Sequence, residues 1–154
     1  MILHRRLIPI LTLCLMVNCG GQKVATQPSP SDPLRQIAVQ IDRAAGGLDA
    51  AIDVKRALLR DGLITQAQSA SLTPKILTAI RLVRELKDTL ATVDDFQTGK
   101  PQIAAVFARV QSGFSALSDL GVIPAGQARD KIDAALRVAS AALASLQPLL
   151  GGGR

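Results

Sequence analysis

The sequence predicts an all-α fold, a small antiparallel up-down bundle of about four helices, over residues 33–150. Apolar residues recur there every three or four positions, which is the spacing of one helix face. No segment alternates apolar and polar residues with β-branched side chains, so we expect no sheet. Short loops with Pro, Gly or capping residues separate four such segments, and helices joined by short loops pack antiparallel.

The first helix is predicted to begin at Asp32-Pro33, because Asp caps free backbone amides and Pro fits the first helical turn. Its apolar face extends from Leu34 to Leu59. Gly62 then suits the left-handed conformation that often ends a helix. Gly46-Gly47 interrupts this face, and we expect a close contact with another helix there, with a local kink as the alternative.

The second helix is predicted to begin either at Thr65 or at Thr73-Pro74. Thr65 and Gln68 have the spacing of a capping box, and Thr73-Pro74 is a further cap followed by Pro. We expect a short helical turn over residues 65–72 that leads into the long helix, whose apolar face continues to Val93.

Proline and glycine also mark the predicted third and fourth helices. Pro101 is expected to open the third helix after a break over residues 94–100, with Gly99 as the stop before it. Gly121 is expected to end that helix and Pro124 to open the fourth. The fourth helix is then expected to end at Pro148 and the glycines 151–153. We expect a core rich in Leu, Ile, Val and Ala, in which the only aromatic residues are Phe96, Phe107 and Phe114.

Residues 57–64 and 116–123 form a weak internal repeat, in which a helix end and a Gly precede an apolar pair. We expect the pairs Leu63-Ile64 and Val122-Ile123 to pack beneath the two bends. Duplication and convergence on favourable turn chemistry explain the likeness equally well, because two hairpins are too few to establish a repeat array.

The first 32 of the 154 residues have a different character from the rest of the chain. Arg5 and Arg6 precede an uncharged apolar run over residues 7–17, which is the pattern of a secretory signal. The run is too short to span a bilayer, which needs about 20 apolar residues, and a buried N-terminal helix is the alternative. The predicted organisation is a signal peptide at 1–18, a flexible linker at 19–32, the helical domain at 33–150 and a disordered tail at 151–154.

Cys19 ends the apolar segment in Met16-Val17-Asn18-Cys19-Gly20, and here the sequence resembles a bacterial lipoprotein precursor. The resemblance covers only about the first 20 residues. It implies that the Cys19 sulfur receives a diacylglycerol, that Cys19 becomes the first residue of the mature chain, and that acyl chains such as palmitate anchor it in a membrane. Met16 and Asn18 replace the usual Leu and small residue, and ordinary signal cleavage nearby is the alternative.

The reactive side chains of the sequence gather in this leader. The single His is His4, the two cysteines are Cys14 and Cys19, and the chain has no Tyr or Trp. Once the leader is removed or anchored, a nucleophile would have no His beside it, and no metal-ligand spacing remains. We therefore expect no enzyme activity, no cofactor and no metal site. Asp94-Asp95 is the one adjacent acidic pair, and we expect it to be solvated.

The net charge of +6 falls to +4 when cleavage at Cys19 removes Arg5 and Arg6, which argues against a nucleic-acid partner. Six basic residues are candidates for a contact with a phosphate-bearing lipid or an acidic partner. The alternative is a solvated face on which nearby acids balance them. They are Lys55, Arg56, Arg60, Arg81, Arg84 and Lys87.

These observations predict a non-enzymatic, exported lipoprotein of the cell envelope that serves as a binding or structural module. Its partners would be a membrane, through the lipid anchor on Cys19, and a protein. The anchor would lie in the outer face of the cytoplasmic membrane or in the outer membrane. The alternative is a soluble secreted or periplasmic helical protein, including an accessory protein of a phage or mobile element with a membrane-active or partner-binding role.

Overall fold

The computed structural model describes residues 32–118 and 121–151. The predicted signal peptide, the lipidation site Cys19, most of the predicted linker and residues 152–154 lie outside the described residues. Over the described ranges the elements are α1 (Pro33–Arg60), α2 (Gln66–Ala91), α3 (Phe96–Ser118), α4 (Gln127–Ala144) and the short α5 (Gln147–Leu150). These ranges contain no strand, so the predicted all-α bundle is confirmed.

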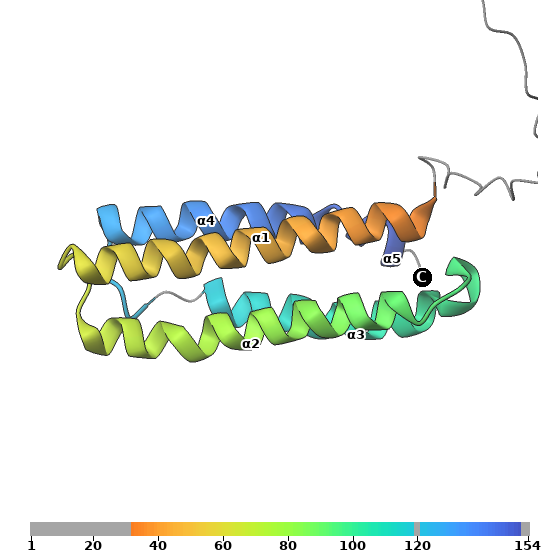
Figure 1. The fold of residues 1–154 in the computed structure, drawn as a ribbon, viewed down its shortest axis with the longest axis horizontal. Coiled ribbons are helices and arrows are strands. Elements are labelled where there is room, and N and C mark those ends of the chain that lie inside the picture. Colours follow the sequence, from red (N-terminus) through yellow and green to blue (C-terminus); the bar gives the residue numbers. More distant parts are fainter. Residues whose placement is uncertain (1–31, 119–120, 152–154) are drawn as a thin grey trace, which may run out of the picture.

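The four long helices form two layers (Figure 1). α1 and α4 make one layer and α2 and α3 the other, and each helix has its most extensive contact with its partner in the same layer. Between the layers, α1 packs along α2, whereas α3 contacts α4 at few positions. One end of the bundle carries the start of α1, the α2–α3 turn and α5, and the opposite end carries the α1–α2 and α3–α4 loops.

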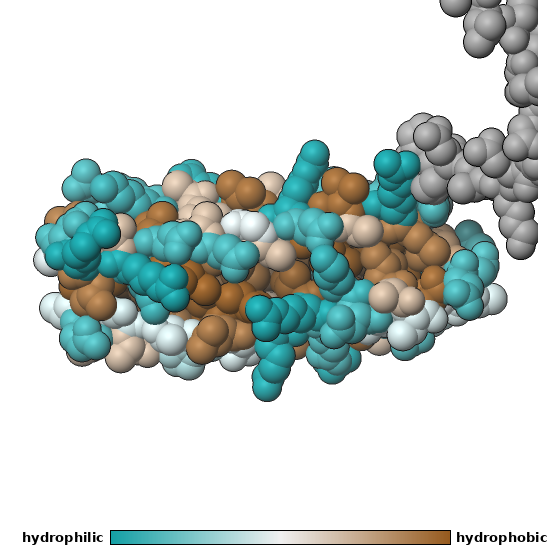
Figure 2. Space-filling view, viewed as in Figure 1, coloured by the Kyte–Doolittle hydropathy of each residue, from teal (hydrophilic) through white to brown (hydrophobic). Residues whose placement is uncertain are grey.

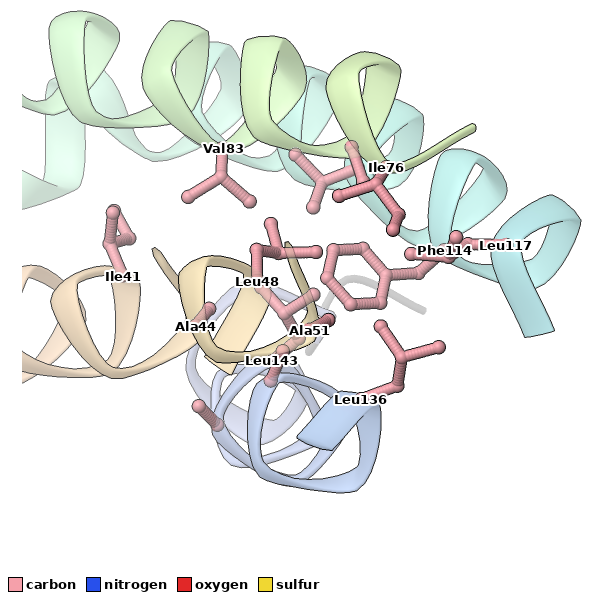
Figure 3. Packing of buried hydrophobic residues seen from close by; sticks show 14 of the residues in the cluster. Ile41, Ala44, Leu48, Ala51, Ile76, Val83, Phe114, Leu117, Leu136 and Leu143 are labelled. Carbon is pink, nitrogen blue, oxygen red and sulfur yellow. The ribbon is translucent and has the colours of Figure 1, made fainter. Parts of the chain in front are cut away.

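The apolar faces of all four long helices meet between the two layers (Figure 3). Phe114 extends from α3 into this space between Ile76 of α2 and Leu136 of α4, and only 6 % of it is exposed. A large aromatic side chain thus fills the core where the α3 and α4 backbones are far apart. The largest side chains that are less than 2 % exposed are Ile37, Ile41, Leu48, Leu58, Leu72, Ile76, Leu86, Ile103, Leu117, Ile123 and Ile132.

Small residues hold the helices of each layer close together. A Cβ placed on Gly47 of α1 would lie 2.7 Å from the backbone nitrogen of Ala139 of α4, and one placed on Gly113 of α3 would overlap the side chain of Leu82 of α2. The close helix contact predicted at Gly46-Gly47 is therefore confirmed at Gly47. Gly46 has no such neighbour within 4 Å.

Both predicted ends of α1 are confirmed. The Asp32 carboxylate accepts a hydrogen bond from the backbone N–H of Leu34 at 3.0 Å, which caps the helix start. At the other end Gly62 has a φ of +70°, and the backbone N–H of Leu63 donates to the Leu58 carbonyl at 2.9 Å. This pattern is a Schellman motif, in which a left-handed glycine lets the chain turn away from the helix.

α2 begins at the first of its two predicted starts. The Thr65 N–H donates to Gln68 Oε1 at 2.7 Å, and the Gln68 N–H donates to Thr65 Oγ1 at 3.2 Å, so the capping box is complete. The expected separate turn over 65–72 is instead the beginning of one continuous helix that contains Pro74. Burial of Leu72 fixes this part of the helix against the core and offsets the cost of an internal proline.

The predicted start of the third helix is wrong, because α3 begins five residues before Pro101, at Phe96. Asp95 caps it by accepting from the Thr98 N–H at 3.0 Å. Gly99 is a buried residue of the first turns of α3 and not a stop. A Cβ at this position would overlap the Val93 side chain, so the glycine serves the tight α2–α3 turn.

The fourth helix also differs from the prediction at both ends. α4 begins at Gln127 and not at Pro124, because Gly126 has a φ of +142°, which a helix cannot contain. α4 ends at Ala144, and Pro148 lies in the first turn of α5 rather than ending α4. Proline fits there because the first helical amides have no partner within the helix.

Only one residue of each repeated apolar pair packs beneath its bend. Ile64 and Ile123 are buried, whereas Leu63 and Val122 are 45 % and 39 % exposed. The expectation that both residues of each pair would be covered is therefore wrong. At each bend the second residue of the pair packs into the core, while the first is exposed to solvent.

Candidate functional site

The predicted basic residues lie on α1 and α2, the two helices that face the viewer in Figure 1. Lys87 of α2 forms an ion pair with Asp42 of α1 at 2.7 Å. Lys55 of α1 donates to Thr73 Oγ1 of α2 at 2.6 Å. Both contacts cross the line where the two helices meet, which we call the α1–α2 seam, and they show which residues of the antiparallel pair lie opposite each other.

Two shallow depressions lie along the α1–α2 seam between these contacts. The first is small, at about 60 Å³, and its walls are apolar except for Asp49 and Arg84. The second has a volume of about 250 Å³ and includes Leu77, which is 54 % exposed. Figure 2 shows the result as a strip of apolar surface between the two helices, bordered by hydrophilic side chains. The apolar residues that line the two depressions are Ala45, Leu48, Ile52, Ile76, Leu77, Ile80 and Val83.

The six predicted basic residues do not form an unbroken basic surface. Arg56 pairs with Asp53 at 3.6 Å, and Arg60 lies 3.4 Å from Asp61. Their side chains are more than half exposed, so each pair contributes little to stability. The α1–α2 seam is therefore an apolar strip whose border carries both acidic and basic side chains.

Around the first depression, the signs on this border are segregated between the two helices. Beside the first depression, α1 contributes the acids Asp42 and Asp49. On the other side α2 contributes Arg84 and Lys87, and Arg81 lies about one turn before Arg84 on exposed helix surface. Asp88 adds an acid beside Lys87. Around the first depression, the α1 edge of the seam is therefore acidic and the α2 edge mainly basic, whereas beside the second depression α1 contributes the bases Lys55 and Arg56.

Three of these charged groups have no ionic partner within the described part of the chain. Asp49, Arg81 and Arg84 are exposed, and among residues 32–118 and 121–151 none of them forms an ion pair or a hydrogen bond through its charged group. Asp49 and Arg84 line the same depression without pairing. These charges are free to meet charges on another molecule.

Sequence reasoning identified the basic residues of the seam but missed the acidic ones. Asp42 and Asp49 are seven residues apart, so they lie on one helix face, and this spacing was available in the sequence. What the sequence could not provide is the register of α1 against α2, which places Asp42 opposite Lys87.

A second feature is the end of the bundle that carries the α1–α2 and α3–α4 loops. The Gln68 side chain, in the first turn of α2, donates to the Val122 carbonyl at 3.2 Å and so ties the start of α2 to the α3–α4 loop. A depression of about 250 Å³ lies beside this contact, between Leu63 and the segment from Ile123 to Ala128. Its lining carries no charged side chain, and we regard it as packing between two loops.

In residues 32–118 and 121–151 no group of three or more His, Cys, Asp or Glu side chains could hold a metal ion. No helix within these ranges is both long and apolar enough to cross a membrane. In the acidic pair Asp94-Asp95, the Asp95 carboxylate caps α3 by accepting from the Thr98 N–H. Comparisons with protein-family models, with curated proteins and with solved structures found no match.

Proposed function

We propose that this chain is a non-enzymatic lipoprotein of the cell envelope, anchored through Cys19, whose helical bundle serves as a binding or structural module. One observation carries the proposal: a basic start at Arg5-Arg6, an apolar run over 7–17 and Cys19 follow one another at the spacing of a lipoprotein signal. Several acyl chains on one cysteine give a stable anchor, whereas a single chain does not.

The position of α1 supports an anchored module. α1 begins at Pro33, at one end of the bundle, and residues 20–32 separate it from Cys19. A linker of this length and composition has an r.m.s. reach of about 20 Å. The bundle would thus be attached by its end, which leaves the α1–α2 seam accessible along its side.

Intact-mass analysis of the full chain, expressed in bacteria and purified from the membrane fraction, tests the anchor. We expect a mature chain that begins at Cys19 and carries the added mass of a diacylglycerol and further acyl groups. Cys19→Ala is expected to leave the chain unprocessed or to release it from the membrane. Cys14→Ala is the matched control, because Cys14 lies within the apolar run and is expected to be lost with the signal.

The result that overturns the anchor is an unmodified soluble chain, or a membrane chain that retains residues 1–18. Asn18 favours one second candidate, a soluble secreted or periplasmic helical protein made by ordinary signal cleavage, because lipoprotein signals usually have a small residue before the cysteine. Under the proposed function, Asn18→Ala should increase the processed, acylated fraction. Under the second candidate it should leave the soluble fraction unchanged.

A further inference from the structure

We propose that the α1–α2 seam binds a second copy of this chain, so that two bundles associate side by side with their helices in the same direction. This inference names the partner of the module proposed above, and it rests on that proposal for the anchoring of both copies in one membrane. Its primary observations are the segregated charges and the exposed apolar strip of the seam.

The charges around the first depression make that part of the face complementary to itself. In a two-fold dimer whose axis runs parallel to the helices, α1 of one copy lies over α2 of the other. Because Asp42 lies opposite Lys87, and Asp49 shares a depression with Arg84, the α1 acids of each copy then lie at the height of the α2 bases of its partner. Asp49 and Arg84, which have no ionic partner in the described part of one chain, thereby gain one in the other copy.

The same pattern disfavours the opposite orientation. If the two-fold axis ran across the helices, α1 would lie over α1 and α2 over α2. With that axis at the first depression, Asp42 and Asp49 would face the same acids of the other copy, and Arg81 and Arg84 would face the same bases. Like charges placed across an interface oppose association, so the charges around the first depression favour the orientation in which both bundles point the same way.

That orientation also suits two anchored chains. Both α1 helices begin at the same end of the dimer, so both linkers and both Cys19 anchors can meet one membrane surface. With the axis across the helices, the two α1 helices would begin at opposite ends of the dimer. Charge complementarity and the direction of the chain therefore select the same arrangement.

The surface available is sufficient for a specific contact between anchored proteins. α1 has 28 residues, so the face is about 40 Å long at 1.5 Å per residue and about 20 Å wide across two helices. A copy laid along all of it covers at most about 800 Å² on each side, which is an average size for a specific interface. Its centre is the apolar strip with Ile52, Leu77 and Ile80. Anchoring in one membrane would raise the effective concentration of such a partner.

Reversing one charge of the proposed contact tests it. Two full-length chains with different C-terminal tags are expressed together and solubilised in detergent, and recovery of one tag with the other is measured. We expect Asp49→Arg in both chains, or Arg84→Asp in both, to lower recovery about tenfold, because two contacts of opposite charge become two of like charge. Pairing one Asp49→Arg chain with one Arg84→Asp chain restores both contacts, and we expect recovery to return to that of the unchanged chains.

The matched control makes the same charge changes on α4, with Asp130→Arg and Arg137→Asp, which are also exposed and lie away from the seam. They should leave recovery unchanged, and circular dichroism should show unchanged helix content for all variants. The proposal is overturned if the unchanged chains are not recovered together, or if the mixed pair is no better than either variant alone. Association of a Cys19→Ala chain at higher concentration separates the two proposals, because it would show the dimer contact without the anchor.

Discussion

Gly47 of α1 lies against the backbone of Ala139 of α4, so these two helices touch without side chains between them. A Cβ on Gly47 would lie 2.7 Å from the Ala139 nitrogen and 2.9 Å from the Ala139 Cβ. Both values are shorter than an ordinary van der Waals contact. Gly47 therefore sets the distance between α1 and α4, whereas its neighbour Gly46 is exposed.

The two glycines give a matched pair of substitutions. We expect Gly47→Ala to lower the free energy of unfolding by about 1–3 kcal/mol, because the added methyl must push α4 away. Gly46→Ala adds a methyl in open space and removes the helix cost of glycine, so it should raise the free energy of unfolding by up to about 1 kcal/mol. Urea unfolding of the full chain, followed by circular dichroism, measures both. Effects of the same sign would contradict a backbone contact at Gly47.

The α2–α3 turn offers a second test at Gly99, whose missing side chain makes room for Val93. We expect Gly99→Ala to cost about 1–3 kcal/mol of stability, since the new methyl would overlap a valine methyl. Val93→Ala removes that methyl, so the double variant should cost less than the two single changes together. A double-mutant cycle from thermal unfolding gives the coupling, and strictly additive costs would argue that the two residues are not in contact.

Phe114 is the aromatic residue that fills the space between α3 and α4. We expect Phe114→Ala to lower the free energy of unfolding by about 3–5 kcal/mol, because α3 and α4 have few other contacts to close the cavity. Phe114→Leu keeps most of the apolar volume and should cost about 1.5 kcal/mol or less. Phe96 is only half-buried, so Phe96→Ala is a control with a smaller loss than Phe114→Ala. Equal losses in chemical unfolding would contradict the role assigned to Phe114.

Gln68 both completes the α2 cap and holds the α3–α4 loop. We expect Thr65→Ala to cost about 1 kcal/mol through the cap alone. Gln68→Ala should cost more, because it also removes the hydrogen bond to the Val122 carbonyl, and it should speed cleavage of residues 121–126 by a nonspecific protease. Thr65→Ala leaves that bond in place and should change the cleavage rate less. The same cleavage rate in both variants would show that Gln68 does not restrain the loop.

Local chemistry explains which parts of the fold could be predicted from the sequence. Asp32, Thr65 with Gln68, and Gly62 act through contacts within a few residues, and the structure has each in its predicted role. The starts of α3 and α4 could not be predicted in this way. Pro101 has the local sequence of a helix start, but Asp95 is the cap of α3. Gly99 lies within the helix because it packs against Val93 of the preceding turn.

The candidate site shows the same division. The spacing of Arg81, Arg84 and Lys87 predicts that they lie on one face of α2. This prediction needs only the geometry of a single helix. Whether acidic residues of α1 lie opposite these bases depends on the register between α1 and α2. That register follows from packing along the whole length of both helices. The ion pair between Asp42 and Lys87 reports that register, and no local pattern in the sequence contains it.

The pairing of the first long helix with the last has a consequence for how the chain folds. Gly47 and Ala139 are far apart in the sequence, whereas Leu82 and Gly113, which bring α2 and α3 together, belong to adjacent helices. Contacts between adjacent helices close small loops and form quickly, while the contact between α1 and α4 closes almost the whole domain. As the chain is synthesised from its N-terminus, the face of α1 that carries Gly47 is therefore covered only when α4 has been made. A chain that ends after α3 would leave this face exposed.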